Sequence, residues 1–125
     1  MNNEFGYLSQ FAYSGDSIWF TTSAGRMVHS SNRGVTWNVY QSPLTDFGGT
    51  AIFGDISFAT ASRGVIQSNT GSIFKTTDAG QTWNNVVFSG IGAPYGGAIA
   101  YISGTFHMVS AGGEANFAGS SYSLD

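Results

Sequence analysis

The stretch HSSNRGVTWN at residues 29–38 recurs in altered form as KTTDAGQTWN at residues 75–84. From Asn32 in the first copy to Asp78 in the second, the offset is 46 residues. Repeats of about 40–50 residues are typical of β-propeller blades, each of which is built from four strands. The shared positions, which we call the box, are Ser30, Asn32, Gly34, Thr36 and Trp37 in the first copy and Thr76, Asp78, Gly80, Thr82 and Trp83 in the second.

The last three residues, Ser123, Leu124 and Asp125, resemble the opening of a third box. Between the boxes, short runs of Val, Ile, Thr, Phe, Tyr and Trp alternate with Gly, Ser, Asn and Asp, which predicts strands joined by tight turns. No segment shows a sustained helical period. The predicted strands lie at about 8–14, 17–22, 26–30, 36–41, 55–60, 64–68, 72–77, 83–88, 97–102 and 105–110, with a further strand beginning near 118.

The sequence therefore predicts an all-β fold: about two and a half four-stranded antiparallel blades of a β-propeller, forming an incomplete ring. The whole chain, 1–125, is predicted to be one partial propeller. Its blades are expected at about 7–41, 55–88 and 97–125, and the last blade lacks its outermost strand. Because closed propellers need four to eight blades, we expect the ring to be completed by further blades of a longer parent chain or by self-association.

The composition restricts the partners of the chain. Its 125 residues carry a net charge of −3, and only 9% of them are charged. The four basic residues are scattered along the chain, which argues against nucleic acid or an anionic membrane as partner. There is no cysteine, and no segment resembles a signal peptide or a membrane helix. If the parent protein is secreted or displayed on the cell surface, its signal is expected outside this chain.

Each box position has a mechanical role in a tight turn between two strands. Asn32 and Asp78 can accept hydrogen bonds from backbone N–H groups later in the turn. Glycine permits the positive φ that such a turn needs, and the Ser and Thr hydroxyls can tie the strand ends together. Trp37 and Trp83 are expected to begin the fourth strands and to bury their rings between neighbouring layers. We therefore interpret the box as a turn lock between the third and fourth strands.

A cation site is the functional alternative for the box. The carboxylate of Asp78 is replaced by an amide, Asn32, in the other copy. Such a pair is a poor match to Ca²⁺, which takes six to eight oxygen ligands. The sequence predicts neither a bound metal nor a cofactor.

The two boxes resemble the Asp boxes, also called BNR repeats, of β-propeller proteins. Families that carry them include sialidases, xyloglucan-cleaving glycosidases, sortilin-type receptors and photosystem-assembly-factor-like bacterial propellers, the last being the most similar in style. The resemblance covers nearly the whole chain. It implies the architecture and not an activity, because function depends on the site and not on the fold.

Catalytic residues are not evident in the sequence. The resemblance to sialidases would imply an arginine triad, but the arginines are Arg26, Arg33 and Arg63, and the N-terminal arginine motif is absent. A glycosidase of another type needs two carboxylates roughly 5–9.5 Å apart. Asp55 and Glu114 are the candidate pair. His29 and His107 are interpreted as strand residues.

The resemblance places a ligand surface on the face opposite the boxes, on the loops between strands two and three and between successive blades. These loops are 42–54, 89–96 and 111–117. Their candidate ligand-contacting residues are Asp46, Phe47, Tyr95, Glu114 and Asn116, a composition that suits sugar or peptide binding. Two functions follow as expectations. The first is a non-catalytic scaffold that contacts proteins or carbohydrates, and the second is a fragment of a glycoside hydrolase.

Overall fold

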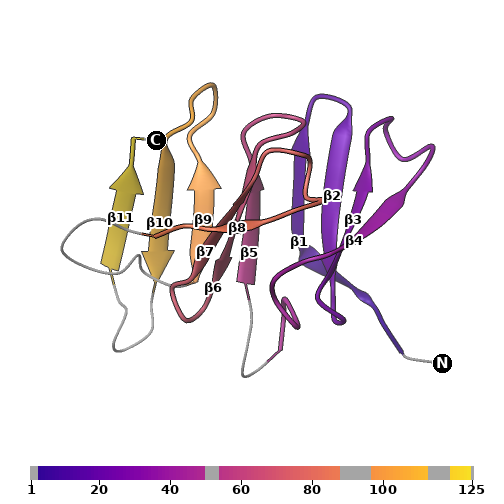
Figure 1. The fold of residues 1–125 in the computed structure, drawn as a ribbon, viewed down its shortest axis with the longest axis horizontal. Helices are drawn as coiled ribbons and strands as arrows, with labels where there is room; N and C mark the ends of the chain where they lie inside the picture. The colour runs from indigo at the N-terminus through magenta and orange to yellow at the C-terminus, as the bar shows by residue number, and fades with distance from the viewer. Residues whose placement is uncertain (1–2, 50–53, 88–96, 113–118, 125) are drawn as a thin grey trace.

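The computed structural model describes residues 3–49, 54–87, 97–112 and 119–124, and they form three antiparallel sheets (Figure 1). The first sheet has the order β1-β2-β3-β4, the second β5-β6-β7-β8 and the third β11-β10-β9. The strands are β1 (Gly6–Ser14), β2 (Ser17–Thr22), β3 (Arg26–Ser30), β4 (Asn38–Gln41), β5 (Gly54–Phe58), β6 (Gly64–Ser68), β7 (Ile73–Thr76), β8 (Asn84–Asn85), β9 (Ala98–Tyr101), β10 (Met108–Gly112) and β11 (Gly119–Ser123).

Each sheet is a meander in which consecutive strands pair. The first strands of the three sheets, β1, β5 and β9, lie next to one another, and the sheets fan out from them (Figure 1). This arrangement confirms the predicted fold class of two four-stranded blades and one incomplete blade. No helix long and apolar enough to cross a membrane occurs in the described segments.

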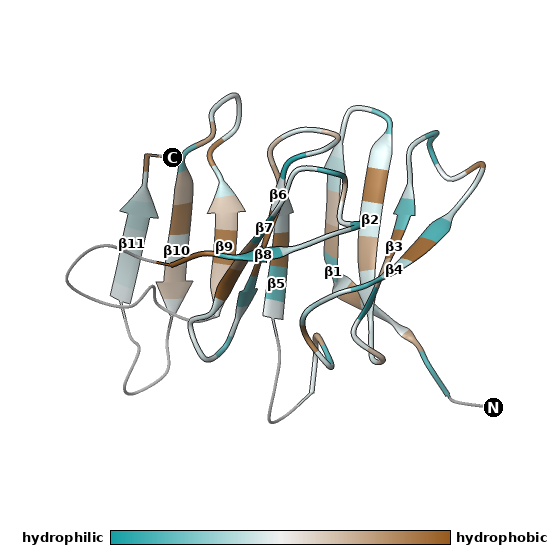
Figure 2. Cartoon of the chain, in the orientation of Figure 1, coloured by the Kyte–Doolittle hydropathy of each residue, from teal (hydrophilic) through white to brown (hydrophobic). Residues whose placement is uncertain are grey.

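Strand formation follows the alternation of side chains in the sequence. In β2, buried residues alternate with half-buried ones from Ser17 to Phe20, and in β5 the same alternation runs the length of the strand. Because successive side chains point to opposite faces, Trp19 of β2 and Ile56 and Phe58 of β5 are placed in the core between the first two sheets. Figure 2 shows the resulting hydrophobic bands along the strands, whereas β11, with the sequence GSSYS, is pale throughout.

The main core lies between the first and second sheets. Trp19 of β2 is fully buried and is stacked between two rings, Phe58 of β5 at 3.7 Å and His29 of β3 at 4.7 Å between ring centroids. The indole Nε1 of Trp19 donates a hydrogen bond to the carbonyl of Ala79 in the second sheet, at 2.9 Å. A smaller core between the second and third sheets consists of Val65, Ile73, Ile99 and Met108.

The observed strands differ from the predicted ones at several ends. β4 and β8 begin at Asn38 and Asn84, one residue after the box tryptophans, because each indole folds back onto its own turn instead of entering the strand. β10 begins at Met108 and not at 105, because a turn closed by Thr105 N–H on the Ile102 carbonyl occupies those residues.

Candidate functional site

The two boxes form turns with nearly the same hydrogen bonds. In the first box the Ser30 hydroxyl accepts from the N–H of Gly34 at 2.7 Å and donates to Asn32 Oδ1 at 3.0 Å. Asn32 Oδ1 also accepts from the N–H of Thr36 at 2.9 Å, and its Nδ2 donates to the Thr36 hydroxyl. Gly34 has φ of 87°, a conformation that a side chain would strain.

In the second box a carboxylate takes the place of the amide. Thr76 Oγ1 accepts from the N–H of Gly80 at 3.0 Å and donates to Asp78 Oδ1 at 2.7 Å. Asp78 Oδ1 also accepts from the N–H of Thr82, and Oδ2 accepts from its hydroxyl at 2.6 Å. Burial acts to raise the pKa of Asp78, but these hydrogen bonds outweigh it, and the pKa lies below its usual range.

The box groups therefore point into their own turn. The side-chain oxygens of Asn32 and Asp78 accept hydrogen bonds from residues no more than four positions away along the chain. The box turn is also tied to the hairpin at the tip of its own sheet, through Arg33 N–H to the Asp16 carbonyl in one sheet and Ala79 N–H to the Ser62 carbonyl in the other. The geometry is that of a lock between strands.

The third sheet carries the start of a box at the same register. Ser30 pairs with Ile18, Thr76 with Gly64 and Ser123 with Met108, each at the start of the second strand of its sheet. Ser123 therefore occupies the position of Ser30 and Thr76. Asp125, the other residue of this partial box, lies outside the described residues.

The two box tryptophans differ in burial, and for Trp37 the expected burial is wrong. Trp83 is half-buried and packs against the main core, with its ring 6.4 Å from Phe58. Trp37 is 43% exposed and contacts Phe20. The cause is position: Trp83 lies over the first sheet, whereas no sheet precedes the first one in the described structure. Both indoles donate to the carbonyl of their own box glycine.

At the opposite ends of the strands, Asp46 forms a polar cluster with Tyr7. The Tyr7 hydroxyl donates to Asp46 Oδ1 at 2.6 Å, and the N–H of Gly48 donates to the same oxygen at 3.1 Å. The hydrogen bond from Tyr7 lowers the pKa of Asp46, and the same bond raises the pKa of Tyr7. Both side chains are half-buried, so the cluster is an ordered polar patch that retains access to solvent.

Phe47, expected to offer a stacking surface on a loop, is fully buried, and the expectation is wrong. Its ring belongs to the main core between the first and second sheets. The Phe47 carbonyl accepts hydrogen bonds from the Gln10 side chain and from the N–H of Gly54. The hydrogen bond from Gln10 holds the backbone at Phe47 against β1, and the aromatic ring of Phe47 points into the core. Tyr95, Glu114 and Asn116, the other candidate ligand-contacting residues, lie outside the described residues.

The acids of the described chain are already engaged. Glu4 forms an ion pair with Arg26, and this hydrogen-bonded partner lowers the pKa of Glu4 to about 2. Asp16 forms an ion pair with Arg33 at 2.7 Å on the exposed surface. No group of three or more His, Cys, Asp or Glu side chains able to hold a metal ion occurs in the segments that the structure describes.

Asp55, one of the two candidate glycosidase acids, joins the second sheet to the third. Its Oδ2 accepts from the N–H of Ile99 at 2.9 Å, and two residues along β5 the Ser57 hydroxyl accepts from the N–H of Tyr101 at 2.9 Å. Burial raises the pKa of Asp55, although the N–H groups of Ile99 and Ile56 oppose the rise. Side chains of β5 thus take the place of a paired strand along the free edge of β9.

The structural roles of Trp19 and of the Tyr7–Asp46 pair were not predicted from the sequence. A signal for Trp19 existed, since it stands in an alternating strand run. The Tyr7–Asp46 contact joins residues 39 positions apart, and no local pattern indicates it.

The three antiparallel sheets, with their first strands side by side, give the chain the fold of β-propeller blades. Neither a protein-family model nor a curated protein matches the sequence. The solved structure of YCF48 bound to D1 peptide, a photosystem assembly factor and β-propeller, is similar, with a TM-score of 0.56 and 21% identity over 87% of this chain. The chain spans about a third of that structure's length, 34%. At this identity the similarity shows the fold alone.

Proposed function

We propose that this chain is part of an Asp-box, or BNR-repeat, propeller that serves as a non-catalytic scaffold for binding proteins. The observation that carries the proposal is its likeness to a propeller, YCF48, whose structure holds a bound peptide. The blade limits of about 7–41, 55–88 and 97–125 belong to the same proposal. In it, the boxes hold the blades in shape, and other residues meet the partner.

The surface proposed for the partner is the polar patch of Tyr7 and Asp46, at the strand ends opposite the boxes. The Asp46 carboxylate is fixed by the Tyr7 hydroxyl and the N–H of Gly48, so its position is set before any ligand arrives. A fixed carboxylate can accept hydrogen bonds from the N–H groups or cationic side chains of a peptide. Preorganisation of this kind favours binding because less conformational entropy is lost.

A glycoside hydrolase is the weaker alternative. It needs two carboxylates on either side of the scissile bond. In the described part of the chain, Glu4 and Asp16 form ion pairs with arginines, and Asp55 accepts a hydrogen bond from the N–H of Ile99 in β9. These bonds favour structural roles for the three acids, and no observation on them favours the enzyme.

The experiment is selection of binders by the purified 125-residue chain from a phage library of random dodecapeptides. A glycan array serves as the parallel probe for carbohydrate. We expect enriched peptides, and we expect Asp46→Asn to weaken their binding by about tenfold or more, as loss of a hydrogen bond to a charged group does.

The matched control is Asp16→Asn, which removes another carboxylate at the opposite end of the first sheet. Peptide affinity should stay within a factor of two of the unmodified chain in this variant. Enrichment of glycans without peptides, or equal effects of the two substitutions, would contradict the proposal.

A further inference from the structure

The three sheets pack on one another by one rule, which is visible in equivalent residues. Three aromatic residues occupy equivalent positions in the three sheets: Tyr13, Phe58 and Tyr101. Each pairs with a residue of the second strand, and that residue pairs in turn with the first residue of the box, which is Ser30, Thr76 or Ser123. Phe58 packs on Trp19 of the preceding sheet, and Tyr101 packs against the smaller core shared with the second sheet. Tyr13 is 72% exposed.

The face of the first sheet that carries Tyr13 is apolar and open, and we call it the leading face. Phe11, Phe20, Val28 and Val39 form one row across its four strands by register. Phe11 is 56% and Val39 51% exposed, and Trp37 adds to this surface beside Phe20. On the opposite face of the sheet, Trp19 and Met27 are fully buried in the core shared with the second sheet.

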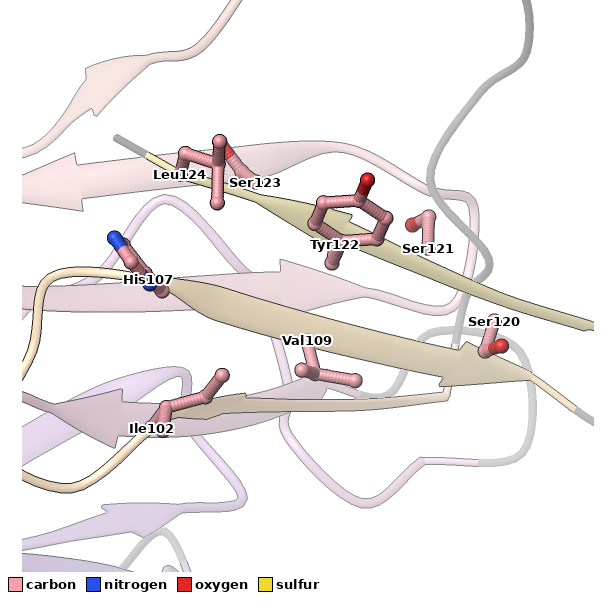
Figure 3. A pocket seen from close by; sticks show the side chains of 8 residues that line it. All are labelled: Ile102, His107, Val109, Ser120, Ser121, Tyr122, Ser123 and Leu124. Atoms are coloured by element: carbon pink, nitrogen blue, oxygen red, sulfur yellow. The ribbon is translucent and has the colours of Figure 1, made fainter.

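The third sheet has the complementary open face, which we call the trailing face. Ala100, Val109 and Tyr122 form one row across it, at the register that Ala12, Trp19 and His29 occupy in the first sheet. An open groove of about 360 Å³ lies there, and Figure 3 shows Val109 and Tyr122 on the adjacent strands β10 and β11 within it. The groove is lined by Ile102, His107, Val109, Ser120, Ser121, Tyr122, Ser123 and Leu124, none of them Asp, Glu, Lys or Arg.

We propose that the leading face of one copy of this chain docks on the trailing face of a second copy, with Tyr13 seated on Val109 and Tyr122. Within the chain, the trailing face of one sheet packs on the leading face of the next at two junctions, between the first and second sheets and between the second and third. The two open faces are the same two kinds of surface. Each copy presents one face of each kind, so the contact is head-to-tail. Two copies then hold four four-stranded and two three-stranded sheets, six in all, and rings of four to eight blades close a propeller.

The row of Phe11, Phe20, Val28 and Val39 on the leading face and the row of Ala100, Val109 and Tyr122 on the trailing face contain no charged side chain, which supports a protein partner with the same kind of surface. Contiguous exposed apolar patches on proteins mark interaction sites. These faces differ from the Tyr7–Asp46 patch, so failure of the self-association leaves the peptide-binding proposal standing, and the reverse also holds.

The test is sedimentation velocity or light scattering of the full 125-residue chain and of two variants, Tyr13→Lys on the leading face and Val109→Lys on the trailing face. The unmodified chain should have the mass of two chains, and each variant that of one. An equimolar mixture of the two variants should recover the two-chain mass, because one of its two junctions joins two unmodified faces. Far-UV circular dichroism reports whether each variant is folded, and Phe11→Lys and Tyr122→Lys replace any that is not.

The matched control is Val87→Lys, at an 88% exposed residue that follows β8 of the second sheet and belongs to neither the leading nor the trailing face. It should keep the two-chain mass. The proposal would be overturned by a single-chain mass, or an open series of larger species, for the unmodified chain. It would also be overturned if the leading-face variant dissociated while the trailing-face variant did not, or if the mixture of the two variants stayed at the mass of one chain.

Discussion

Phe58 of β5 stacks on Trp19 of β2 with ring centroids 3.7 Å apart and planes within 7° of parallel. The two residues belong to different sheets, and Trp19 also bonds the carbonyl of Ala79 across the same junction. The contact between the first two blades is therefore a packed aromatic core with a directed hydrogen bond.

Phe58→Ala should destabilise the fold strongly. Truncating a buried phenylalanine costs about 3 to 5 kcal/mol, from lost burial and from the cavity left behind. Urea denaturation, followed by circular dichroism, measures the change in the free energy of unfolding. Val87→Ala, at a surface residue, is the control and should change it by less than about 0.5 kcal/mol. A loss below about 1 kcal/mol in Phe58→Ala would mean that the stack does not hold the blades together.

The second box should tolerate an amide but not an alanine. Asp78→Asn copies the first box, where Asn32 accepts the equivalent hydrogen bonds, and it should change stability by less than about 1 kcal/mol. Asp78→Ala removes the acceptor for Thr76 and Thr82 and should cost about 1 to 3 kcal/mol. The same urea titration compares them. Equal losses in the two variants would show that the charge, and not the acceptor geometry, matters.

Stability should fall on acidification through the titration of His29. Burial lowers the pKa of this imidazole, which is stacked on Trp19 and whose Nε2 is buried without a hydrogen-bond partner in the described structure. Because the pKa of His29 is lower in the folded state than in the unfolded state, the neutral imidazole contributes fully to folding stability above the unfolded-state pKa of about 6.5. This contribution is lost as pH falls from that value through the folded-state pKa.

The check is thermal unfolding of the unmodified chain and of His29→Phe at pH 7.5 and pH 5.5. The unmodified chain should lose more stability between these two values than the variant does. Equal pH dependence in the two proteins would assign the effect to other groups.

The junction between the second and third sheets should depend on Asp55 as an acceptor. Asp55→Ala leaves the N–H of Ile99 without its partner and should cost about 1 to 3 kcal/mol. Asp55→Asn keeps an acceptor oxygen.

Stability should also depend on pH through Asp55. Because burial raises the folded-state pKa of Asp55, its contribution to stability is lost as pH rises through that value, and Asp55→Asn should remove this loss. Urea titrations at pH 4 and pH 7 separate the two effects, and an alanine variant as stable as the asparagine variant would contradict this role.

Local patterns in the sequence predicted the fold class because the box, the alternating strands and the 46-residue repeat all act within one blade. Burial between blades could not be predicted in the same way. Trp37 and Trp83 stand at equivalent box positions, yet only Trp83 lies over another sheet. Phe47 is in a predicted loop, and long-range bonds from Gln10 and Gly54 to its carbonyl turn it into the core. Asp46 was among the candidate ligand-contacting residues predicted from the sequence, but its hydrogen-bond partner Tyr7 is 39 positions away and no local pattern indicates the contact.

We propose that the boxes are turn locks and that a partner binds at the other end of the sheets. The most direct measurement is the affinity of one phage-selected peptide, by isothermal titration calorimetry, for Asp78→Asn and Asp46→Asn side by side. Asp78→Asn should bind within a factor of two of the unmodified chain, and Asp46→Asn should bind about tenfold more weakly. Weakened binding in Asp78→Asn with unchanged binding in Asp46→Asn would contradict it.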